Sequence, residues 1–250
     1  NKKLITTSKT MTTENYWHMK PNKPIAIQMA KRQISEFVHD AVNLEGINMS
    51  LPEIQTLLDG VTIGGHKLSD VQIALNQAKA WKAIFDMVEK DRFELSVETV
   101  CHLHAIAAEG EALTHGEFRY TSVFITGTDY TPPEAEKLSG LFNEMVEQAN
   151  KIEDVYERSF YVFLHMARNQ YFFDVNKRTG RFMMNGMLLS AGYPAVNVSA
   201  KRQMEFNQKM IDFYENSNTG PMNDFLRSCL DQKLINIMDE AHRKEPSRSK

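Results

Sequence analysis

An apolar run leads directly into a cluster of cations, and this sequence feature constrains the fold most. Residues 160–164, Phe-Tyr-Val-Phe-Leu, are apolar on nearly all sides, which predicts a helix buried in the middle of a helical bundle. The loop over residues 168–181 follows immediately and brings Lys177, Arg178 and Arg181 to the start of the next helix. The sequence therefore predicts two successive helices joined by a strongly charged loop.

These three cations stand at the electrostatically unfavourable end of their helix. A helix N-terminus carries partial positive charge and unpaired N–H donors, so the cations should destabilise it unless an anion binds there. Exposed amides, the helix dipole and two arginines three residues apart together predict a phosphate site. Asp174, just ahead of the cations, is placed to hold a divalent metal that bridges phosphates. The alternative is an Asn-capped helix whose cations are only solvated.

Composition limits the class of protein. The chain has 250 residues, 42% of them hydrophobic and 24% charged, which fits a soluble globular protein. A net charge of -3 gives no global reason to expect nucleic-acid binding. No segment reaches the length of a membrane span, and the N-terminus lacks the apolar core of a secretion signal. We therefore expect a cytoplasmic protein, without a membrane partner, in which Cys101 and Cys229 are reduced core thiols.

Helical periodicity covers most of the chain and predicts an all-α fold. The predicted helices span Ile25 to Glu45, Leu51 to Asp59, Leu68 to Glu89, Ser96 to Glu109, Pro133 to Asn150, Asp154 to Asn169, Lys177 to Ala191, Ala200 to Asn216 and Met222 to Arg243.

One region departs from this pattern and predicts a small β-hairpin. Val123, Phe124 and Ile125 form a short β-branched and aromatic run, and the segment Thr-Gly-Thr over 126–128 supplies a turn. The segment Tyr-Thr-Pro-Pro over 130–133 then ends it, with the next helix starting at the second Pro. An isolated hairpin is marginal in water, so we expect it to have a function or a partner.

Together these motifs resemble the Fic family (filamentation induced by cAMP), whose members mostly transfer AMP from ATP to protein hydroxyls. Residues 170–181 are similar to the family signature H-x-F-x-(D/E)-G-N-(G/K)-R-x-x-R, and residues 116–133 are similar to the β-hairpin flap that precedes it. The resemblance covers roughly residues 25–230 and implies a Fic-type helical bundle with a small β-hairpin flap. It implies a core domain over 61–235, after an extension over 1–60 and before a polar tail over 236–250.

The resemblance also implies the roles of the loop residues. Asp174 would bind Mg²⁺ between the α- and β-phosphates of ATP. The phosphate-binding residues would be Asn176, Lys177, Arg178 and Arg181, with Asn176 in an anion hole and Arg181 at the γ-phosphate. The flap residues Val123, Phe124, Ile125 and Tyr130 would hold a target protein by edge-strand addition and bring its Tyr, Thr or Ser hydroxyl to the α-phosphorus.

A second element resembles the family's inhibitory helix, (S/T)-x-x-x-E-(G/N), and lies in the extension before the core. Residues 41–46, Ala-Val-Asn-Leu-Glu-Gly, match it except that Ala41 replaces Ser or Thr. A carboxylate in the last helical turn opposes the helix dipole, which indicates independently that Glu45 has a cationic partner. In the family this Glu pairs with the last Arg of the signature, here Arg181, and blocks productive placement of ATP. The resemblance thus implies autoinhibition through Glu45.

Three positions depart from the family pattern. Gln170 occupies the place of the catalytic His, and an amide cannot take a proton near neutral pH, so catalysis should be impaired. Val175 places a stiff β-branched side chain where the family has Gly. Lys177 replaces the second Gly of the AMP-transferring pattern.

These departures keep other functions open. Asn-Lys-Arg-Thr over 176–179 also resembles the Doc branch of the superfamily, whose toxin is a protein kinase, and Gln170 keeps a catalytically silent nucleotide-binding module open. A metal hydrolase is disfavoured because His102 and His104 are two residues apart on a predicted helix and cannot face one ion. A homodimer also stays open, since many relatives self-associate.

Overall fold

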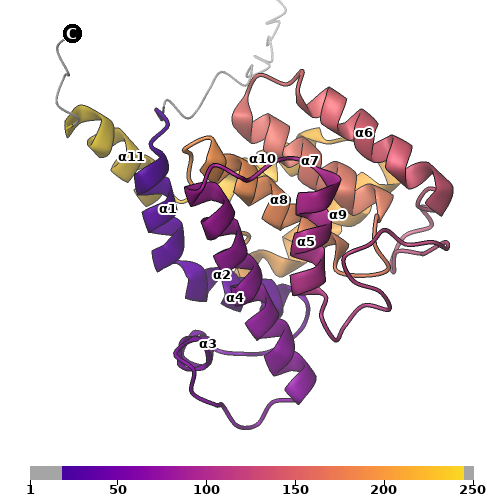
Figure 1. Cartoon of the computed structure of the whole chain (residues 1–250), viewed down its shortest axis with the longest axis horizontal. Helices are drawn as coiled ribbons and strands as arrows, with labels where there is room; N and C mark the ends of the chain where they lie inside the picture. The colour runs from indigo at the N-terminus through magenta and orange to yellow at the C-terminus, as the bar shows by residue number, and fades with distance from the viewer. Residues whose placement is uncertain (1–18, 245–250) are drawn as a thin grey trace, which may run out of the picture.

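Two packed helices, α7 (Val155–Asn169) and α8 (Asn176–Ser190), occupy the centre of the computed structural model, which describes residues 19–244 (Figure 1). They make the most extensive contact between any two elements. Asp154 begins α7, because its side chain accepts a hydrogen bond from the Glu157 amide. The buried helix predicted from residues 160–164 is confirmed, since four of these five side chains are at most 1% exposed.

The other helices surround this pair, and the predicted all-α class is confirmed. They are α1 (Lys23–Arg32), α2 (Ile34–Leu44), α3 (Leu51–Leu58), α4 (Leu68–Glu89), α5 (Val97–Ala107), α6 (Leu138–Ala149), α9 (Gln203–Asn216), α10 (Gly220–Ser228) and α11 (Gln232–Lys244), with 3₁₀ turns at Ala135–Lys137 and Ala200–Arg202. Within residues 19–244, no helix combines the length and the apolar character that crossing a bilayer requires.

The central pair separates two hydrophobic cores. Val162 of α7 and Phe182 of α8 pack into one core with α2, α4, α5 and α6. Phe163 of α7 and Met184 of α8 pack into the other with α9, α10 and α11. Because α7 and α8 are buried on several sides, the loop that joins them is fixed by packing on both sides.

Two predicted helices are each divided in two. Gln33 ends α1 with φ -97° and ψ 5°, and the resulting bend lets both α1 and α2 turn their apolar residues toward the interior. Residues 229–231 separate α10 from α11, and α11 lies beside α1 (Figure 1). Of the predicted extension over 1–60, residues 1–18 lie outside the described residues, as do residues 245–250 of the predicted polar tail.

The predicted β-hairpin is replaced by an irregular loop. Gly127 does make a turn with φ 91°, but no part of residues 19–244 forms a β-strand. Phe124 is 85% exposed, so the flanking run has little apolar burial to stabilise a pair of strands. A two-stranded ribbon without a third strand or a covering surface is only marginally stable, which explains why this segment is a loop and not the predicted hairpin.

Gly180 of α8 packs closely against Phe163 of α7, and substitution can test this contact. A Cβ added at Gly180 would lie 3.0 Å from a ring carbon of Phe163 and 3.2 Å from its carbonyl oxygen. Because this backbone cannot yield easily, we expect Gly180→Ala to destabilise the protein by about 1–3 kcal/mol in chemical denaturation. Gly140→Ala on α6 is the control: it meets nothing within 4 Å and should stabilise by about 0.5–1 kcal/mol. Equal effects of the two substitutions would contradict this packing.

Candidate functional site

The loop between α7 and α8 is held in an uncommon backbone conformation at both ends. Gln170 ends α7 with φ 49°, and Val175 precedes α8 with φ 63°. The left-handed region disfavours a β-branched residue, at a cost of order 1–3 kcal/mol, which explains why a Gly at position 175 would be natural. The Val175 side chain is only 3% exposed and packs in the first core, so its burial offsets part of this strain.

Asn176 closes this loop with its side-chain amide. Its Oδ1 accepts from the Phe172 amide at 2.9 Å, and its Nδ2 donates to the Phe172 carbonyl at 2.8 Å. Nδ2 also donates to Oε1 of Gln170 at 2.9 Å, while Nε2 of Gln170 donates to the Ala167 carbonyl. Gln170 is thus held between α7 and the first residue of α8. Asn176, predicted for an anion hole, directs its side chain into the loop.

The N-terminus of α8 lacks the groups that usually neutralise it. No side chain caps it, and its first turn contains no acidic residue. The three predicted cations follow, with Lys177 half-buried and Arg178 and Arg181 only 3% and 8% exposed. Unpaired helical amides next to buried cations favour a bound anion.

Arg181 is the most unusual of these cations. Its Nη1 and Nη2 atoms are both buried without a hydrogen-bond partner. Burial lowers its pKa, against the opposing effect of the Glu45 carboxylate. A buried guanidinium with unused donors is costly, so this side chain is suited to an anionic ligand.

Glu45 lies against these arginines, which supply the cationic partner expected for a carboxylate at the end of a helix. It is the C-cap residue of α2, and Gly46 follows with φ 81°. Its Oε1 is 3.6 Å from Nε of Arg178, so its ion pair is with Arg178 and not with the expected Arg181. Burial alone would raise the pKa of Glu45, but the charges of Arg178, Lys177 and Arg181 outweigh it and hold that pKa below its ordinary value. Glu45 is therefore a stable anion at neutral pH.

A polar clasp fixes the end of α2 that carries Glu45. Asp40 accepts hydrogen bonds from Nδ2 of Asn197 at 2.6 Å and from the Ala200 amide at 3.0 Å. Nε2 of Gln203 donates to the carbonyls of Asn43 and Leu44 at 3.0 and 3.1 Å. These contacts join residues some 160 positions apart in the chain, so sequence periodicity could not have found them.

An open cleft of about 640 Å³ lies over the α7–α8 loop. Its walls combine the end of α2, the loop that replaces the hairpin, the α7–α8 loop and α9. They include the predicted residues Glu45, Phe124, Ile125, Gln170, Asp174 and Lys177. Such a volume is in the range of small-molecule sites.

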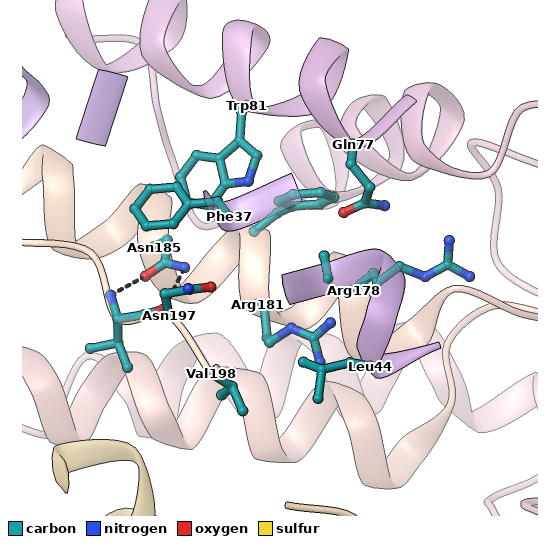
Figure 2. Close-up of a pocket in the computed structure, with 12 residues that line it drawn as sticks. Phe37, Leu44, Gln77, Trp81, Arg178, Arg181, Asn185, Asn197 and Val198 are labelled. Atoms are coloured by element: carbon teal, nitrogen blue, oxygen red, sulfur yellow. Dashed lines mark hydrogen bonds between the residues drawn. The ribbon is translucent and has the colours of Figure 1, made fainter. Parts of the chain in front are cut away.

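A small cavity of about 20 Å³ lies nearby and is lined by Arg178 and Arg181 (Figure 2). Figure 2 shows the two arginine side chains extending in different directions from α8. The guanidinium of Arg178 is bonded to Glu111, which follows α5. Nη1 and Nη2 of Arg178 donate to the two carboxylate oxygens of Glu111 at 2.8 and 2.5 Å. Sequence reasoning did not identify Glu111.

Arg119 anchors the loop that replaces the hairpin. Its guanidinium, 2% exposed, donates to the carbonyls of Asn169 and Gln170 at the end of α7. It also donates to the carbonyls of Thr121 and Pro133, near the two ends of the loop. A cation at a helix C-terminus is favourable, so this contact fixes the loop beside the cleft. Arg119 lies in the segment 116–133 that resembles the family's flap, but the sequence did not indicate this anchoring role.

Other residues of this loop divide between packing and exposure. Ile125 and Tyr130 pack against the second core, and the Arg168 guanidinium lies 3.9 Å from the centre of the Tyr130 ring. Val123 is half-buried, whereas Phe124 projects into solvent. The exposed Phe124 and the unpaired backbone beside it form a surface that a peptide could contact.

His104 links the cleft to this loop, although it was set aside in the sequence. It is fully buried and stacks on Phe172 with ring centres 3.7 Å apart. Its Nδ1 accepts from the Gly116 amide at 3.0 Å, so the proton resides on Nε2, which donates to the Asp174 carbonyl at 3.1 Å. Burial lowers the pKa of His104 to about 4, so it is neutral at pH 7. Within residues 19–244, no group of three or more His, Cys, Asp or Glu side chains is arranged to hold a metal ion.

Comparison with known proteins shows which family this chain resembles. A family model described as Fic/DOC family matches residues 94–188, which contain α5, α6, α7, the α7–α8 loop and most of α8. The protein adenylyltransferase Fic of Drosophila grimshawi is 26% identical over 217 residues, covering 82% of this chain and 43% of that protein. The protein of the same name from Aedes aegypti is 26% identical over 218 residues, covering 83% and 42%. This chain thus spans less than half the length of these curated relatives.

Solved structures share the fold. Fic-1 from C. elegans superposes with a TM-score of 0.74 at 18% identity, over 90% of this chain and 68% of that one. A Fic domain containing signaling protein from Bacteroides thetaiotaomicron gives a TM-score of 0.71 at 17% identity, over 92% and 94%. The predicted resemblance to the Fic family and its helical fold is confirmed.

The role of Arg119 can be tested by replacement. Arg119→Ala leaves several carbonyls without their donor, so we expect a loss of about 3 kcal/mol in stability. We also expect faster proteolysis within residues 116–133. Arg158→Ala is the matched control, because its guanidinium bonds the carbonyls of Ile152 and Glu153 near the other end of α7. Unchanged protection of residues 116–133 in Arg119→Ala would refute the anchoring role.

Proposed function

Residues 94–188 form a Fic/DOC-family domain, and on that premise we propose that this chain is a protein adenylyltransferase that transfers AMP from ATP to a target hydroxyl. Glu45 inhibits this site, and Gln170 impairs its chemistry. The curated relatives support AMP transfer by their name, protein adenylyltransferase Fic. The observation on this chain that carries the proposal is Arg181, whose two terminal nitrogens are buried without a partner near an uncapped helix N-terminus.

The triphosphate of ATP fits this cationic environment. Phosphate transfer needs positioning and charge neutralisation more than covalent chemistry from the protein. The uncapped amides of α8 supply hydrogen-bond donors, and Lys177 supplies a cation on the cleft wall. Arg181 supplies the donors for the terminal phosphate once Glu45 moves away. The cleft above them is large enough for the nucleoside.

Asp174 is the residue that would hold Mg²⁺. It is exposed and lines the cleft, and its Oδ1 accepts a hydrogen bond from the Val175 amide at 2.6 Å, which leaves Oδ2 for an ion. Mg²⁺ typically takes one or two protein carboxylates together with substrate phosphates and water, so a single Asp fits this ion. When bound, Mg²⁺ supplies charge neutralisation at the phosphates.

The reaction requires a base that this chain lacks at position 170. The target hydroxyl oxygen forms a bond to the α-phosphorus, the bond to the bridging oxygen breaks, and pyrophosphate leaves. The hydroxyl proton must pass to a base, and the Gln170 amide cannot accept it. Both ends of that amide are already hydrogen-bonded, to Asn176 and to Ala167. Gln170 therefore preserves the loop while the proton passes only to water.

The loop over residues 120–130 is the proposed docking surface for the target. Its exposed Phe124 and its backbone without sheet partners support contact with an extended peptide. Ile125 lines the cleft, so a docked segment would lie over the nucleotide site. A cytoplasmic location, a homodimer, and a Tyr, Thr or Ser acceptor remain predictions, as does a core domain over 61–235.

Lys177 favours one alternative reaction. Lys177 lines the cleft. The AMP-transferring pattern has a Gly at this position, whereas the Doc-like pattern has a Lys. A nucleotide bound in the reverse sense would transfer its γ-phosphate, and the protein would be a kinase. A silent nucleotide-binding module is the third possibility, because Gln170 lacks a proton acceptor.

The proposal is tested with the double variant Gln170→His, Glu45→Gly in the presence of α-labelled ATP, Mg²⁺ and a cell lysate. A restored base should raise labelling by about 10² to 10⁴ over Glu45→Gly alone. Adding Arg181→Ala should abolish the label, because the terminal phosphate then has no partner. If only γ-labelled ATP marks protein, the site is a kinase. If neither label transfers although ATP binds, the silent module is correct and AMP transfer is excluded for this chain.

A further inference from the structure

Glu111 makes a bidentate ion pair with Arg178 beside the site, and the proposed function gives it no role. It lies just after α5, in the turn where its amide donates to the Ala108 carbonyl. Its carboxylate accepts two parallel hydrogen bonds from Nη1 and Nη2 of Arg178. The Arg178 side chain is 3% exposed and that of Glu111 is 20% exposed. A bidentate pair in such a protected place is strong and geometrically specific.

This contact determines which side of Arg178 remains available. Both terminal nitrogens are directed at Glu111, and only Nε faces Glu45, at 3.6 Å and without a hydrogen bond. Arg178 and Arg181 both line the small cavity and neither lines the open cleft, but only Arg178 has its terminal nitrogens bonded to a carboxylate. The guanidinium fork of a residue expected to bind phosphate is therefore already occupied by a carboxylate.

The charges explain why this orientation persists. Burial alone would lower the pKa of Arg178, but the hydrogen bonds to Glu111 and the charge of Glu45 raise it above its ordinary value. One guanidinium is thus shared by two carboxylates from different elements, Glu45 at the end of α2 and Glu111 after α5. A carboxylate and a phosphate match the same guanidinium fork, so they compete for it directly.

We propose that Glu111 is a second inhibitory carboxylate, a positioning residue that withholds Arg178 from the phosphates of the nucleotide. This inference rests on the proposed function, because it assumes that ATP binds at the start of α8. Removing Glu45 takes a carboxylate away from the neighbourhood of Arg181, but both terminal nitrogens of Arg178 stay bonded to Glu111. Full engagement of both arginines by a triphosphate then requires release of Glu111 as well. The loop over residues 116–133, which Arg119 anchors, begins only a few residues after Glu111. Docking of a target protein on this loop is therefore positioned to influence the release of Glu111.

Calorimetric titration of the whole chain with ATP and Mg²⁺ tests the proposal. Glu111→Gln keeps the size of the side chain but replaces one acceptor oxygen with an amide NH₂, a donor that cannot accept a hydrogen bond from the guanidinium. We expect it to bind ATP about tenfold more tightly than the parent, because the fork becomes available to phosphate. The same gain should appear when Glu111→Gln is added to Glu45→Gly.

Glu109→Gln is the matched control for charge. Glu109 lies two residues away and is exposed; its carboxylate forms an ion pair with Lys79 at 3.9 Å, and its backbone carbonyl, which the substitution keeps, accepts from Asn76. Its replacement changes the net charge equally without touching Arg178, so affinity should stay within about twofold of the parent because exposed charges are screened. In an Arg178→Ala background, Glu111→Gln should give no gain, because its effect passes through that arginine.

The outcomes separate this inference from the proposed function. If Glu45→Gly and every other variant fail to bind ATP, the nucleotide site itself is wrong and the role of Glu111 is lost with it. If Glu45→Gly binds ATP but folded Glu111→Gln shows no gain, only the role of Glu111 is overturned. A gain that persists in the Arg178→Ala background, or equals that of Glu109→Gln, also overturns it. Should Glu111→Gln not fold, Glu111→Asp keeps the charge, loses the bidentate reach and should show a smaller gain.

Discussion

The ion pairs of the first turns of α8 are the interaction on which this structure depends. Burying Arg178 and Arg181 removes two charges from water, at a cost that only well-placed anions can offset. Glu111 and Glu45 provide that compensation for Arg178. Arg181 has no hydrogen-bonded partner at its terminal nitrogens. The site is thus only partly neutralised, which is the electrostatic condition for binding a further anion.

The surrounding fold serves to hold these charges in place. The α7–α8 pair is enclosed by two cores, so the start of α8 cannot move to solvate its cations. Asp40 and Gln203 clasp the end of α2 and thereby fix Glu45 over Arg178. Arg119 and His104 join the α7–α8 loop to the neighbouring loop through hydrogen bonds to backbone groups. Inhibition, nucleotide binding and target docking would therefore share one rigid support.

Local sequence was sufficient for the features that depend on neighbouring residues. The apolar run at 160–164 predicted a buried helix, and the cations at 177–181 predicted an unusual helix start, because both depend on spacing within one helix. Contacts between distant segments were not accessible in this way. Glu111 meets Arg178 across 67 positions, and His104 meets the Asp174 carbonyl across 70. The hairpin prediction was wrong for a related reason, since strand pairing needs a partner that propensity does not supply.

The crystal structure of the Glu45→Gly variant with ATP and Mg²⁺ tests the central claim most directly. The claim is that carboxylates occupy the place of nucleotide phosphates at the start of α8. It predicts the triphosphate against the α8 amides, with the terminal nitrogens of Arg181 bonded to phosphate oxygens and the nucleoside in the cleft beside Asp174 and Lys177. A nucleotide bound elsewhere, or Arg181 still without a partner beside bound ATP, would contradict it.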